Sequence, residues 1–87
     1  MAYTALIHEL EDELGVSLPR NNMSQANSLI AKVLRESTDE ITLPILTLRI
    51  VRALIPLFGE DRLREGSQVE YELVQALQPF VVDLIAQ

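Results

Sequence analysis

The most apolar segment of the chain, residues 41–58, constrains the fold more than any other part of the sequence. From position 45 to its end the only polar side chains are Thr47, Arg49 and Arg52. A helix that is apolar around most of its circumference must be covered by other elements on several sides. The segment therefore predicts a helix that lies at the centre of its assembly.

Two prolines and a glycine set the expected limits of this central helix. Pro44 suits a first turn, where its missing N–H costs no hydrogen bond, so the helix is expected to start at Thr42 or Leu43. Pro56 removes a hydrogen bond inside the pattern and is expected to kink or end the helix, and Gly59 to terminate it.

A membrane span is the alternative interpretation of the same segment, because its length is nearly sufficient. Arg49 and Arg52 lie in its middle, and each would cost roughly 2.5–3.5 kcal/mol at the centre of a bilayer. The first residues, 1–4, also lack a basic region followed by an apolar core, so no signal peptide is predicted. We expect a cytoplasmic protein without a transmembrane segment.

Two helices are predicted before this segment. Apolar residues at spacings of three and four indicate the first, over residues 2–14, and Gly15 suits the left-handed position that ends a helix. The second is expected from Ser24, as its N-cap, to Ser37. Their expected inner faces are Tyr3, Leu6, Ile7, Leu10 and Leu14 in the first, and Ala26, Leu29, Ile30, Val33 and Leu34 in the second.

A fourth helix is predicted from Ser67 to about Ile85. Ser67 and Glu70 fit a capping box, in which each side chain binds a backbone N–H of the other end of the motif. Its expected inner stripe is Val69, Leu73, Ala76, Leu77, Phe80 and Leu84, widened by Val74, Val81, Val82 and Ile85. Nothing alternates with the period of a strand. The sequence thus predicts one all-α domain over residues 1–87, an antiparallel four-helix bundle with a possible short extra helical turn near residues 60–65.

Composition excludes several classes of function. The chain has 13 acidic and 7 basic residues, for a net charge of −6, whereas nucleic-acid binding needs clustered positive charge. It has no cysteine and one histidine, His8, whose neighbour one turn later, Asp12, is the only evident second metal ligand. The three glycines are too widely spaced for a phosphate-binding loop. We expect a non-enzymatic protein without a metal or cofactor.

Arg49 and Arg52 are the most informative charges, because they interrupt an apolar helix. Buried charge is costly unless it is paired, so these arginines are expected to meet carboxylates. The candidates are Glu70 or Glu72 on the neighbouring helix, or acids of a partner.

Apolar residues make up 48% of a chain of only 87. A domain of this size buries only about 60–65% of the surface that its unfolded chain exposes. We therefore expect more apolar side chains than one small core can hold, and self-association through the third and fourth helices, most simply as a homodimer. The residues predicted to take part in partner binding or self-association are Arg49, Arg52, Leu57, Phe58, Phe80 and Ile85.

Three segments resemble the immunity proteins of pediocin-like bacteriocins, the enterocin A type. Leu6-Ile7-His8-Glu9-Leu10 is similar to the opening helix of that family, and Leu43-Pro44-Ile45-Leu46 with Arg49 to its proline-started third helix. The segment from Glu70-Tyr71-Glu72-Leu73 to Leu77 is similar to its fourth. The resemblance implies a cytoplasmic antiparallel four-helix bundle that protects the producing cell by holding the bacteriocin together with its membrane receptor, the mannose transporter.

The resemblance assigns that role to no individual residue of this chain. The sequence also fits a second class of binding protein, a homo-oligomeric helical adaptor or inhibitor of a regulatory protein, as found among phage and bacterial accessory proteins. In both classes the protein acts by binding another protein.

Overall fold

A computed structural model describes residues 3–37, 41–59 and 63–86, and it confirms the all-α four-helix fold. The α-helices are α1 (Thr4–Leu14), α2 (Met23–Glu36), α3 (Leu43–Leu54) and α4 (Gln68–Ala86). Two short 3₁₀ helices, η1 (Arg20–Asn22) and η2 (Ile55–Leu57), join the start of α2 and the end of α3. The described residues contain no strand.

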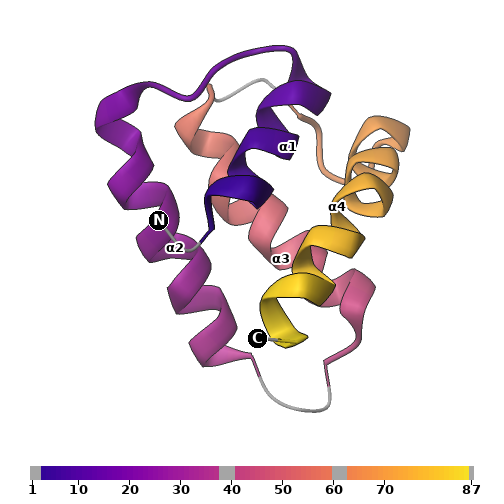
Figure 1. Ribbon diagram of the computed structural model, residues 1–87. Helices are drawn as coiled ribbons and strands as arrows, with labels where there is room; N and C mark the ends of the chain where they lie inside the picture. Colours follow the sequence, from indigo (N-terminus) through magenta and orange to yellow (C-terminus); the bar gives the residue numbers. More distant parts are fainter. Residues whose placement is uncertain (1–2, 38–40, 60–62, 87) are drawn as a thin grey trace.

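The central position predicted for the apolar segment is confirmed. In Figure 1, α2 and α4 lie on either side of α3, and α1 crosses in front; α3 packs against both flanking helices and α1 packs against α4. The end of α3 lies beside the start of α4, where Arg52 contacts Glu70. The start of α3 lies near the end of α4, where Leu43 and Leu84 line one hollow, so the two helices run antiparallel. One side of α3 remains exposed in this arrangement, and it carries Ile45, Arg49 and Arg52.

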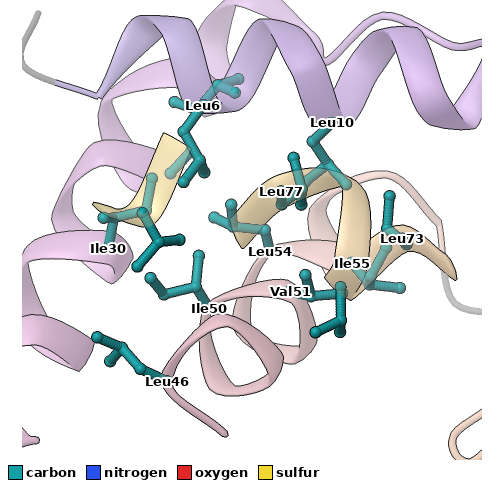
Figure 2. Close-up of a cluster of buried hydrophobic side chains, with 14 of the residues drawn as sticks. Leu6, Leu10, Ile30, Leu46, Ile50, Val51, Leu54, Ile55, Leu73 and Leu77 are labelled. Carbon is teal, nitrogen blue, oxygen red and sulfur yellow. The ribbon is translucent and has the colours of Figure 1, made fainter. Parts of the chain in front are cut away.

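The core is one continuous cluster to which all four helices contribute. Figure 2 shows Leu6 and Leu10 of α1 above the buried residues of α3 and α4. Thr47 is the polar member of the buried face of α3 and is fully buried. Its hydroxyl donates to the Leu43 carbonyl at 2.9 Å, which offsets the cost of removing the hydroxyl from water. The side chains with at most 1% exposure are Leu6, Ile7, Leu10, Ala26, Ile30, Thr47, Ile50, Val51, Leu54, Leu77 and Val81.

The inner face of α4 differs from the expected stripe. Val69 was expected to face the core, but its side chain is exposed, and Glu70 is buried in its place. The buried positions of α4 are Glu70, Leu73, Val74, Leu77 and Val81. These positions follow the ordinary spacing of one helix face, and Glu70 can occupy that face because it pairs with Arg52 of α3.

Two expected helix boundaries need correction or completion. Ser24 is not the N-cap of α2, because η1 runs directly into the helix and the Met23 N–H bonds to the Arg20 carbonyl. Of the extra helical turn near residues 60–65, residues 60–62 lie outside the described part of the chain, and Leu63–Glu65 is not helical. Pro56 ends the α-helix as predicted, since α3 stops at Leu54 and continues only as η2.

Gly15 ends α1 in the predicted left-handed conformation, with φ of 72° and its N–H bonded to the Glu11 carbonyl at 2.8 Å. An added Cβ would touch nothing within 4 Å, so a side chain here costs backbone strain alone. We predict that Gly15→Ala lowers the free energy of unfolding by about 1 kcal/mol, measured by urea denaturation. Gly15→Asn should cost less, because asparagine tolerates this conformation; equal stability of the alanine variant would contradict the assignment.

Candidate functional site

A groove of about 370 Å³ runs along the outer side of the α3–α4 pair. Pro44, Ile45 and Leu48 of α3 form one wall, and Tyr71, Val74 and Gln75 of α4 form the other. Its two rims carry exposed apolar side chains, since Ile45 is 47% exposed and Tyr71 is 60% exposed. We call it the α3–α4 groove. A volume in this range is typical of a binding site for a side-chain cluster or a small ligand.

An ion pair closes one end of the α3–α4 groove. Arg52 donates from Nε to Glu70 Oε2 at 2.9 Å and from Nη2 to Glu70 Oε1 at 3.0 Å. The Arg52 Nη1 atom also lies 3.9 Å from Oε1 of Glu65, whose side chain is largely exposed. This two-bond geometry fixes the planes of both groups and is the strongest form of a charged hydrogen bond. Of the carboxylates predicted for Arg52, which were Glu70, Glu72 or acids of a partner, Glu70 is the one that it contacts.

Glu70 also organises the chain that leads into α4. The Gly66 N–H donates to Glu70 Oε1 at 2.8 Å, and the Ser67 hydroxyl accepts the Glu70 N–H at 3.2 Å. The Ser67 half of the predicted capping box is thus present, whereas Glu70 reaches back to Gly66, one residue before the expected Ser67. The Ser67 N–H instead bonds to the Arg64 carbonyl at 3.2 Å, which explains the shift.

The two partners of this ion pair differ in burial. Glu70 is 4% exposed, but 40% of the Arg52 side chain is exposed. The hydrogen bonds from Arg52 lower the pKa of Glu70 below its ordinary value of 4.5, against the opposing effect of burial, and the Gly66 N–H adds to the lowering. The same hydrogen bonds raise the pKa of Arg52. Both groups are charged at neutral pH.

Arg49 differs from Arg52 in its contacts, although the sequence predicts a carboxylate partner for both. It is exposed on the outward side of α3, one turn before Arg52, and among the described residues no carboxylate lies within ion-pair distance of it. Arg52 is therefore paired within the fold, whereas Arg49 presents its charge at the open side of α3.

The remaining residues predicted for partner binding differ in burial. Leu57, Phe58 and Phe80 are half-buried and pack against the core, whereas Ile85 is 57% exposed near the end of α4. Ile85 borders a second apolar hollow, of about 430 Å³, at the end of the bundle. That hollow is lined by Leu34, Ser37, Ile41, Leu43, Leu46, Leu84 and Ile85.

Sequence reasoning missed Ile45 and Tyr71, the exposed large apolar side chains of the α3–α4 groove. Ile45 was one of many apolar residues on a helix apolar all round, and nothing in the pattern identified its uncovered side. Tyr71 adjoins Glu70, and the inward turn of Glu70 is the signal that could have placed it outside.

Within residues 3–37, 41–59 and 63–86, no three metal-binding side chains come together, and no helix is long and apolar enough to cross a membrane. Comparison with known proteins finds no matching family, no matching curated protein and no matching solved structure. The similarity to bacteriocin immunity proteins therefore stays a prediction.

Proposed function

We propose that this protein acts by binding another protein through the α3–α4 groove, without a chemical step. The observation that carries the proposal is the exposure of Ile45 and Tyr71 on opposite rims of an apolar groove. Burying such rims against a partner removes apolar surface from water, which is the main favourable term in association. The fixed Arg52–Glu70 pair gives the groove a rigid end against which a partner segment can register.

In its specific form, the proposal is an immunity protein that works in the cytoplasm through contact with a membrane receptor complex. Expression of the chain in a strain sensitive to a pediocin-like peptide should then raise survival. Ile45→Glu should abolish the protection, because it puts a charge on the apolar rim. Val69→Glu is the matched control, since Val69 is at least as exposed as Ile45 but does not line the groove.

Each result decides a different part of the proposal. If the peptide kills cells that express the unmodified chain as efficiently as cells that do not, the immunity role is contradicted. Protection that Ile45→Glu retains, in a variant shown to fold by circular dichroism, would exclude the groove as its binding surface.

A homo-oligomeric adaptor is the second candidate, and a separate observation favours it. Val82 and Ile85 are exposed near the end of α4, away from the rims of the α3–α4 groove. Light scattering at micromolar concentration should then give a dimer that Ile85→Glu converts to a monomer. A monomeric unmodified chain would rule out this candidate.

A further inference from the structure

We infer that the occupant of the α3–α4 groove is an amphipathic helix that carries carboxylates beside its apolar side chains. This inference rests on the proposed function and adds the chemistry of the partner. It begins from the shape of the groove, whose α3 wall extends from Pro44 to Arg52. At 1.5 Å per residue this wall is about 12 Å long, which matches about two turns of a docked helix.

The walls define what the apolar side of the occupant contacts. Ile45 and Leu48, three residues apart, lie on one side of α3, and Tyr71 and Val74 are spaced in the same way on α4. Side chains three apart are neighbours on a helix surface, so each wall presents a short apolar ridge. Two apolar side chains one turn apart on a partner helix can seat between these ridges.

The charges around the groove define the polar side of the occupant. Arg49 lies one turn from both Ile45 and Arg52 on α3, is exposed, and has no described carboxylate within ion-pair distance. Arg52 keeps part of its side chain exposed while it holds Glu70. Arg52 thus lines the groove as the partner of Glu70, whereas Arg49 lies outside the lining, one helical turn from the Ile45 rim. A carboxylate on the occupant would meet Arg49 at an otherwise apolar surface, where solvent screening is reduced.

A second copy of this chain fits the groove poorly. Among the described residues that line the groove, Glu70 is the only carboxylate, and Arg52 already occupies both of its oxygens. A symmetric pairing of two grooves would therefore bring Arg49 no free carboxylate from the other groove. The observations favour an acidic helix of a different protein.

The test uses three fluorescent twelve-residue peptides that a side-chain lactam holds helical. Each has two leucines one turn apart, flanked by glutamate in the first peptide, by glutamine in the second and by lysine in the third. Fluorescence anisotropy should show the glutamate peptide binding at least about tenfold more tightly than the glutamine peptide, and the lysine peptide most weakly. Higher salt should reduce the glutamate preference.

Variants of the protein assign the effect to individual residues. Arg49→Gln should remove the glutamate preference and leave the affinity for the glutamine peptide unchanged. The control is Arg35→Gln, which changes an exposed arginine on α2 and should alter neither. Ile45→Glu should weaken binding of the glutamate and glutamine peptides alike.

The outcomes separate this inference from the proposed function. If all three peptides bind equally and Ile45→Glu abolishes their binding, the inference that the partner is acidic is contradicted. The groove would then still be a docking site. A glutamate preference that survives Arg49→Gln would also overturn the inference. Absence of binding by any peptide would contradict both the inference and the groove-based function.

Discussion

Replacing Leu77 with alanine is expected to lower the free energy of unfolding by about 3 kcal/mol. Leu77 is fully buried, and Figure 2 shows it in the cluster that joins α4 to α1 and α3. The loss combines the apolar transfer energy with the cavity that a close-packed core leaves unfilled. Because a domain of this size is stable by only about 4–13 kcal/mol, the variant should lose a large part of its stability.

Urea denaturation measures this effect as a lower midpoint with an unchanged slope. The control is Val69→Ala on the same helix, where the exposed side chain should contribute less than about 0.5 kcal/mol. A loss below about 1 kcal/mol at Leu77 would show that the interior is loosely packed. It would then no longer hold the α3–α4 groove in one shape.

The second large effect is expected from Arg52→Leu, which leaves the Glu70 carboxylate buried without its cation. Removing one partner of such a pair destabilises more than removing both, because the remaining charge stays desolvated. Arg52→Leu should therefore be less stable at neutral pH than the double variant Arg52→Leu/Glu70→Leu. Urea midpoints of the unmodified chain, the single variant and the double variant measure this order. A single variant as stable as the double variant would contradict it.

The pH dependence of stability shows whether the Glu70 carboxylate causes the loss of stability in Arg52→Leu. In the unmodified chain the pKa of Glu70 is lowered, so its contribution is fully present above the ordinary value of 4.5 and is lost as the pH falls through the lower, folded pKa. In Arg52→Leu, burial should instead raise the pKa of Glu70, so that acidification relieves the penalty. The stability difference between the two proteins should therefore shrink as the pH falls from 7 toward 4. A difference independent of pH would mean that Arg52 acts by packing alone.

The helices and their order were predictable because local patterns fix them. The left-handed conformation of Gly15, the proline-started α3 and its end before Pro56 all follow from properties of single residues. A carboxylate partner for Arg52 was predictable as well, since an arginine on an apolar helix requires one, but the pattern did not choose Glu70 over Glu72.

Tertiary contacts decided what the sequence pattern left open. Val69 is exposed because the buried face of α4 runs through Glu70, Leu73 and Leu77, where Glu70 is paired with Arg52 of α3. The start of α2 moved from Ser24 because η1 supplies the backbone bonds that a capping side chain would otherwise satisfy. Ile45 could not be placed at an open rim, because periodicity identifies an apolar face but not whether another helix covers it.

Docking of a helix of another protein between α3 and α4 can be followed residue by residue. Amide NMR spectra of the ¹⁵N-labelled chain, titrated with the glutamate peptide, provide this measurement. Docking predicts shifts that concentrate on Ile45, Leu48, Tyr71 and Val74 and leave the hollow beside Leu34 and Leu84 unchanged. Shifts confined to that hollow, or no shifts at saturating peptide, would contradict it.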